Sequence, residues 1–148
     1  MACPYFDPRE AMDPGEWIHA PRLPLIEAWR GVCRAGDPFE PEESVQREVC
    51  NCGYARGRCA HFREDGADAV RFSMEDGETP RVIYIFEKNG APVTHGTLAG
   101  AGLDGSEILH RQARAFAESW RRRMDHFQSS RGGEKVSTAT ESSSTSME

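Results

Sequence analysis

The chain lacks the features of a membrane protein and those of a secreted one. None of its apolar runs approaches the roughly 20 residues that a membrane span needs. The first residues, MACPYFDPRE, have neither the basic start nor the apolar stretch of a secretory signal. We therefore expect no membrane association and a cytoplasmic location, where thiols are kept reduced and structural disulfides are rare.

The chain also lacks the positive charge that general nucleic-acid binding requires. Its 148 residues carry 24 acidic side chains against 18 Lys and Arg, a net charge of −6. Nucleic-acid binding needs a net positive charge or a dense basic patch. Only residues 105–128 are mildly basic, with five arginines against three acids. This balance argues against nucleic acid as a partner.

Familiar catalytic motifs are absent as well. The sequence contains no His-x3-His, His-Glu-x2-His, Gly-x-Ser-x-Gly, Gly-x4-Gly-Lys-Ser/Thr or Gly-x-Gly-x2-Gly. His95 has no identifiable partner for acid–base chemistry. We therefore lean against an enzyme. The catalytic alternative is an activated cysteine, Cys52 or Cys59, because nearby Arg56 and Arg58 would favour a thiolate.

Prolines concentrate at the start of the chain, where they limit regular structure. Seven of the nine lie in the first 41 residues, which predicts a mostly extended or turning chain over residues 1–24. Helical spacing of apolar residues predicts a short helix over residues 25–35. A second short helix is predicted over residues 41–50, because proline and acidic residues suit a helix start. The apolar residues that predict the first helix are Ile26, Trp29 and Cys33.

The middle of the chain has the periodicity of strands. Apolar and polar residues alternate over residues 68–75, which predicts a strand with one buried face. Residues 82–86 are apolar throughout and suit a central strand. Asn89-Gly90 is a strong signal for a two-residue hairpin turn. We expect a three-stranded antiparallel β-meander over residues 68–98.

The late part of the chain has helical periodicity. Residues 104–107 resemble a capping box, and apolar residues then recur at three- and four-residue steps. A long amphipathic helix over residues 105–128 is predicted to pack its apolar stripe on the sheet. The stripe consists of Leu109, Ala113, Phe116, Trp120, Met124 and Phe127.

These elements predict an α+β fold with an irregular, cysteine-bearing N-terminal half that contains short helices. Residues 129–148 have no aromatic and only two aliphatic side chains, too few to offset the entropy of folding. They are predicted to be a disordered tail. Residues 1–128 then form a single small domain, with the cysteine-bearing segment over residues 1–62, the meander over residues 68–98 and the helix over residues 105–128.

The cysteines are the most distinctive feature of the sequence. All lie in the first 59 residues, near turns, prolines and glycines, and none lies in the predicted meander or the long helix. Gly53 and Gly57 let the chain curl so that backbone N–H groups face sulfur, a contact that tunes thiolate-bound metal centres. Arg56 and Arg58 would offset the thiolate charge. The five cysteines are Cys3, Cys33, Cys50, Cys52 and Cys59.

We predict that Cys3, Cys33, Cys50 and Cys59 ligate one metal centre. Cys52 is the spare thiol, because neighbours in Cys-x-Cys often point different ways, and His61 is a substitute ligand. The sequence lacks the paired Cys-x2–4-Cys spacing of most zinc sites, whereas iron–sulfur ligands are often more dispersed. A [4Fe-4S] cluster is therefore favoured, with Zn²⁺ as the alternative. Free packing thiols or a redox disulfide remain open.

The functional prediction follows from this site. We expect a metal- or cluster-binding protein with a redox, sensing or accessory role. The alternative is a zinc-stapled interaction module that docks a protein partner through a basic helix face. The same arginines would also suit phosphate, unless they are simply the polar face opposite the apolar stripe. That face carries Arg111, Arg114 and Arg121.

The order of the cysteine motifs carries a resemblance. Cys-Pro-Tyr-Phe, then Gly-Val-Cys, then Cys-Asn-Cys-Gly-Tyr-Ala-Arg with a following Cys resembles small uncharacterised bacterial cysteine-rich proteins. The resemblance covers residues 3–98 and implies no activity.

Overall fold

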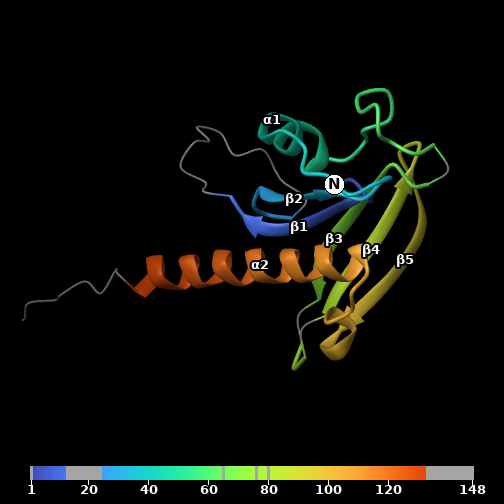
Figure 1. Ribbon diagram of the computed structural model, residues 1–148. Helices are drawn as coiled ribbons and strands as arrows, with labels where there is room; N and C mark the ends of the chain where they lie inside the picture. Colours follow the sequence, from blue (N-terminus) through green and yellow to red (C-terminus); the bar gives the residue numbers. More distant parts are fainter. Residues whose placement is uncertain (1, 13–24, 65, 76, 80, 133–148) are drawn as a thin grey trace, which may run out of the picture.

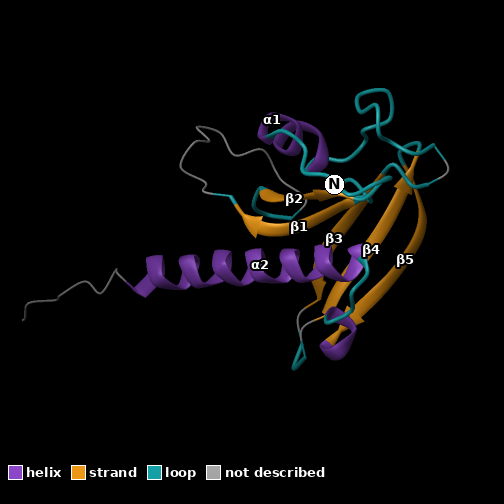
Figure 2. Cartoon of the chain, in the orientation of Figure 1, coloured by secondary structure: helices purple, strands orange, loops and turns teal. Residues whose placement is uncertain are grey.

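The protein has the α+β fold that its sequence predicts. A computed structural model describes residues 2–12, 25–64, 66–75, 77–79 and 81–132. Within them lie two antiparallel sheets, short helices in the N-terminal half and a long C-terminal helix (Figures 1 and 2). The strands are β1 (Phe6–Ala11), β2 (Trp29–Cys33), β3 (Ala69–Glu75), β4 (Arg81–Lys88) and β5 (Ala91–Ala99). The helices are α1 (Glu43–Val45), the π-helical turn η2 (Gln46–Cys50), the 3₁₀ turn η3 (Gly100–Leu103) and α2 (Ile108–Gly132).

The predicted meander is confirmed. Strands β3, β4 and β5 pair antiparallel in that order, so the apolar strand β4 is central. Asn89 and Gly90 both have positive φ, 55° and 78°, the conformation of a tight hairpin turn. Val70, Phe72 and Val82 are buried on the face that α2 covers.

The predicted helix over residues 25–35 is wrong. Residues 29–33 form β2, which pairs antiparallel with β1 from Phe6 opposite Cys33 to Ala11 opposite Trp29. Two residues four positions apart share a face in a helix and also in a strand, so the spacing of Trp29 and Cys33 fits both. Strand β1, far away in the sequence, decides between the two by supplying the hydrogen-bond partners. We call β1 and β2 the ribbon.

The predicted helix over residues 41–50 is confirmed as α1 followed by η2, which lies on the ribbon (Figure 1). Two buried side chains attach it there. Gln46 Oε1 accepts from the N–H of Gly31 at 2.8 Å, and Asn51 accepts from the N–H of Trp29 and donates to its carbonyl at 2.9 and 2.8 Å. These side-chain amides satisfy buried backbone groups of β2 that, among the described residues, have no other strand beside them. They therefore fix the position of Cys50, which lies between them in the sequence, against β2.

Helix α2 confirms the long amphipathic helix, but only its first half is covered. Phe116 stacks on Phe72 with ring centroids 5.8 Å apart, while Trp120 is only partly buried. Met124 and Phe127 are 38% and 52% exposed, because the helix projects beyond the sheet (Figure 1). The predicted packing of the whole apolar stripe is therefore wrong for its last two members.

The predicted boundary of the tail needs a correction. Helix α2 runs to Gly132, so residues 129–132 continue the helix instead of starting a disordered segment. Residues 133–148, the rest of that predicted tail, lie outside the described residues, as do residues 13–24 of the predicted extended start. Among the described residues, no helix has the length and apolar character needed to cross a membrane.

Candidate functional site

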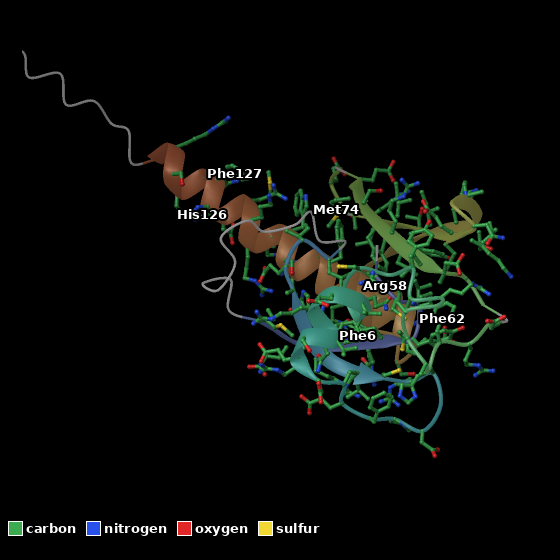
Figure 3. The ribbon with its side chains drawn as sticks, turned by 90° about the horizontal axis from the view of Figure 1, so that it is seen from above. Phe6, Arg58, Phe62, Met74, His126 and Phe127 are labelled. Atoms are coloured by element: carbon green, nitrogen blue, oxygen red, sulfur yellow. The ribbon has the colours of Figure 1, made fainter. Side chains whose placement is uncertain are left out.

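Four cysteines line one small cavity at the end of the ribbon. Cys3, Cys33 and Cys50 are buried around it, and Cys59 is partly buried. Its volume is about 20 Å³. Sulfur atoms are visible beside the labelled Phe6 and Phe62 in Figure 3. We call this the cysteine cavity, and apolar side chains complete most of its wall: Tyr5, Phe6, Ala35, Val49, Ala55 and Phe62.

Backbone pairing brings three of these cysteines together from distant parts of the sequence. The N–H of Cys3 donates to the carbonyl of Cys50 at 3.0 Å. Cys33 stands opposite Phe6 in the ribbon, and the N–H of Arg34 donates to the carbonyl of Tyr5 at 2.9 Å. The turn that follows Cys3 therefore joins the end of β2 to the end of η2.

Cys59 reaches the cavity through a curled loop. Gly53, Tyr54 and Gly57 have positive φ of 72°, 52° and 78°, so the chain turns sharply after η2, as predicted for the two glycines. The N–H of Cys59 then donates to the carbonyl of Ala55 at 2.8 Å.

Arg56 ties this loop to the start of the sheet. Its Nε donates to Asp68 at 2.9 Å, and its guanidinium also lies 3.8 Å from Glu64. The N–H of Asn89 and the Arg56 guanidinium hold the pKa of Asp68 below its usual value. Arg56 is thus engaged with carboxylates, and the sequence-based role of offsetting thiolate charge is not what its contacts show.

Cys52 lies apart from the other cysteines. Within the described residues it is not part of the cavity wall, and its thiol donates to the carbonyl of Arg47 at 3.4 Å. Burial raises the pKa of Cys52, with the charge of Arg58 opposing the rise. A raised pKa is the reverse of what an activated nucleophile needs, so this part of the enzyme alternative loses its support.

His61 lies on the wall of the cysteine cavity, at its exposed side. Its ring packs against that of Phe39, with centroids 4.6 Å apart. The structure thus gathers Cys3, Cys33, Cys50 and Cys59, leaves Cys52 outside and puts His61 at the edge.

Two of the four thiols, Cys50 and Cys3, have a raised pKa. Burial raises the pKa of Cys50 to about 12, and the charges of Cys3, Cys33 and Cys59 add to the rise. Burial likewise raises the pKa of Cys3 to about 11, although the N–H groups of Tyr5 and Phe6 point at its sulfur and oppose the rise. At neutral pH these two thiols hold their protons unless a cation replaces them.

In this structure, the side chains that line the cysteine cavity are not arranged to ligate a single metal ion. Among the described residues, no group of three or more His, Cys, Asp or Glu side chains is arranged to hold a metal ion. The five cysteines are all free of disulfides. Metal ligation therefore requires the thiols to lose protons and shift, which couples binding to local folding.

Gln112 supports the site and was not predicted. From α2, its Nε2 donates to the carbonyls of Cys3 and Phe6 at 2.8 and 2.7 Å, and the side chain is buried. These bonds hold the turn that carries Cys3. A polar residue between Leu109 and Phe116, on the apolar side of the helix, is the sequence signal that could have identified it.

Comparison with known proteins gives no relative. No family model, no curated protein and no solved structure matches the chain. The interpretation of the cysteine cavity therefore rests on its own geometry and chemistry.

Proposed function

We propose that Cys3, Cys33, Cys50 and Cys59 ligate one [4Fe-4S] cluster, in a redox, sensing or accessory role without catalytic turnover. The supporting observation is the meeting of four thiols, from three separate parts of the chain, around one apolar cavity. Soft thiolates are the ligands that such clusters use.

Two features favour a cluster as the occupant. The N–H groups of Tyr5 and Phe6 face the sulfur of Cys3, and N–H···S contacts of this kind stabilise thiolates that bind iron. The remaining wall is mostly apolar, which limits the access of water and helps to set a reduction potential. Free thiols would also need a reducing compartment, which agrees with the expected cytoplasmic location.

A zinc staple is the second candidate, and the size of the cavity favours it. A space of about 20 Å³ suits one ion better than a cubane, which would have to push the four sulfurs apart. Zinc bound there would cross-link the turn after Cys3, the end of β2 and the curled loop. The protein would then act as an interaction module.

Metal analysis of the wild-type protein, purified without oxygen, tests the proposal. A cluster predicts a brown protein that absorbs near 400 nm, with about four iron atoms and four acid-labile sulfides per chain. A colourless protein with about one zinc per chain would replace the cluster with the staple. A metal-free protein that stays so after anaerobic incubation with iron, sulfide or zinc would contradict both.

A further inference from the structure

A second, larger cavity lies between the ribbon and α2. Its volume is about 320 Å³, within the range of small-molecule sites. It shares no lining residue with the cysteine cavity. We call it the arginine cleft, and its charged and aromatic wall consists of Arg9, Trp29, Arg111, Arg114 and Glu118.

The cleft is built over one buried carboxylate that holds three arginines. Asp7 is 0% exposed, and its Oδ2 accepts from Arg111, Arg34 and Arg9 at 2.6, 2.8 and 2.9 Å. Its Oδ1 has no hydrogen-bond partner among the described residues. A single negative charge thus faces three guanidinium groups, each with N–H donors left over.

Arg114 adds a fourth guanidinium at the same end. It donates to the carbonyls of Leu103 and Gly105 at 3.0 and 3.2 Å, which holds it near the start of α2, beside Arg111. In the described part of the chain it has no carboxylate partner. In the cleft wall, three guanidiniums face two carboxylates, Asp7 beneath it and Glu118 within it, which leaves an excess of one positive charge.

The other end of the cleft offers an acceptor. Glu118 stands two helical turns beyond Arg111, roughly 10 Å along the axis. Trp29 Nε1 donates to Ser119 at 3.0 Å and marks this end. Arg122 bonds Glu27 at 2.7 Å and comes no closer than 4.0 Å to Glu118. The Glu118 carboxylate is therefore weakly paired, and its side chain is exposed.

We propose that the arginine cleft binds a small phosphate monoester that carries hydroxyl groups. A phosphate monoester holds between one and two negative charges at neutral pH, opposite in sign to the excess charge of the cleft. Planar guanidiniums bind its oxygens in pairs. The phosphate lies among Arg9, Arg111 and Arg114, and a hydroxyl donates to Glu118.

The proposal revises the predicted docking face of α2. Arg111 and Arg114 are partly buried and line the cleft, whereas Arg121 is exposed outside it. A concave cleft of about 320 Å³ suits a small ligand, while a protein partner needs a broad surface. The cleft is independent of the metal proposal, since neither its wall nor its charges involve the cysteines.

The test is ³¹P line broadening and calorimetry with the full chain, using ribose 5-phosphate, inorganic phosphate and ribose as probes. We expect ribose 5-phosphate to bind best and ribose not at all. Arg114→Gln should weaken the binding at least tenfold, and Arg9→Gln, at a more exposed site, should weaken it severalfold. The matched control Arg121→Gln should leave it unchanged. Glu118→Gln should weaken ribose 5-phosphate but not inorganic phosphate.

Four results would overturn the proposal. These are no binding at millimolar ribose 5-phosphate, equal losses in Arg114→Gln and Arg121→Gln, loss of binding in 150 mM NaCl whatever the variant, and tighter binding of a glutamate-rich peptide than of ribose 5-phosphate. Thermal melting of each variant separates lost binding from lost folding. If Arg114→Gln does not fold, Arg9→Gln decides the outcome.

Discussion

The cysteine cavity and the arginine cleft are built on the same ribbon, yet their chemistry is opposite. Phe6 and Cys33 face the first, while Arg9 and Trp29 face the second. The cysteine cavity is small and mostly apolar, and burial raises the pKa of Cys3 and Cys50, so these two thiols hold their protons until a cation takes their place. The arginine cleft is larger and carries excess positive charge, so it suits an anion. A two-stranded ribbon can therefore support two unrelated sites, because different residues of each strand face different neighbours.

The two sites also differ in what supports them. Asp7 holds the arginine cleft through charge, whereas Gln112 and Asn51 hold the cysteine cavity through neutral hydrogen bonds. Removing one partner of a buried ion pair lowers the stability more than removing one partner of a neutral hydrogen bond. Substitutions of Asp7 and of Gln112 should consequently lower the free energy of unfolding by different amounts, and this difference can be measured.

The largest loss of stability is expected from Asp7→Asn. It removes the buried negative charge that pairs with Arg9, Arg34 and Arg111, which should lower the free energy of unfolding by about 3–5 kcal/mol. Urea unfolding measures this loss, with Asp37→Asn at an exposed site as the control. A loss below about 1 kcal/mol would show that Asp7 does not organise the cleft.

The stability of the metal-free protein should fall in alkali. The folded state raises the pKa of Cys3 to about 11 and that of Cys50 to about 12, from an ordinary value of 9.0. The protonated thiols stabilise the folded state fully below pH 9, and this stabilisation is lost as the pH rises through 11 and 12. Raising the pH from 8 to 10 should lower the free energy of unfolding by about 1 kcal/mol for each of the two thiols.

Urea midpoints over this pH range, measured after metal removal, give the result. Serine does not titrate in this pH range, so Cys50→Ser should make the urea midpoint depend less on pH. Cys52→Ser should reduce this dependence less than Cys50→Ser does. An equal slope in wild type and Cys50→Ser would mean that the cavity does not raise the pKa of this thiol.

Gln112→Leu should have a moderate effect on the cysteine cavity. It keeps the size of the side chain but leaves the carbonyls of Cys3 and Phe6 without their donor, at a cost of about 1–2 kcal/mol. Metal content should fall with it, because Cys3 is held less firmly. Gln128→Leu, on the exposed end of α2, is the control. Unchanged stability and metal content in Gln112→Leu would remove this support from the account.

The smallest effect is expected from deleting residues 129–148. In this segment the side chains of residues 129–131 are exposed, and the hydroxyl of Ser130 donates to the carbonyl of His126 in the same helix. The free energy of unfolding should change by less than about 0.5 kcal/mol. A longer deletion from Ser119 removes the bond to Trp29 and should destabilise the protein clearly. A large loss from the short deletion would show that the end of the chain packs on the domain.

The sequence predicts most of the fold because most of its elements have local signals. The meander follows from alternation and the Asn89-Gly90 turn, and α2 follows from its apolar period. Strand β2 was missed because its pairing with β1 is a long-range contact that no local pattern contains. The end of α2 was placed too early, since residues 129–132 continue the helix without an apolar stripe.

The two sites differ in how visible they are in the sequence. Cysteines are scarce, so their clustering in the first 59 residues marks the cysteine cavity, and the Cys-x-Cys spacing predicts that Cys52 points away from the four that line it. Arginines are common on helix surfaces, and nothing near Arg111 in the sequence indicates that Asp7 lies beside it. Which arginines enclose a cleft depends on how α2 crosses the ribbon, and only the folded chain shows this.

The central claim is that Cys3, Cys33, Cys50 and Cys59 act as one ligand set and that Cys52 does not. The direct measurement is the iron and zinc content per chain of the five single Cys→Ser variants, purified without oxygen beside the wild type. Each of the four cavity variants should lose metal at least about tenfold, because an incomplete thiolate shell does not hold the centre. Cys52→Ser should keep nearly all of it. An equal loss of metal in Cys52→Ser, or a wild-type metal content in Cys3→Ser or Cys33→Ser, would contradict a shared set of these four ligands.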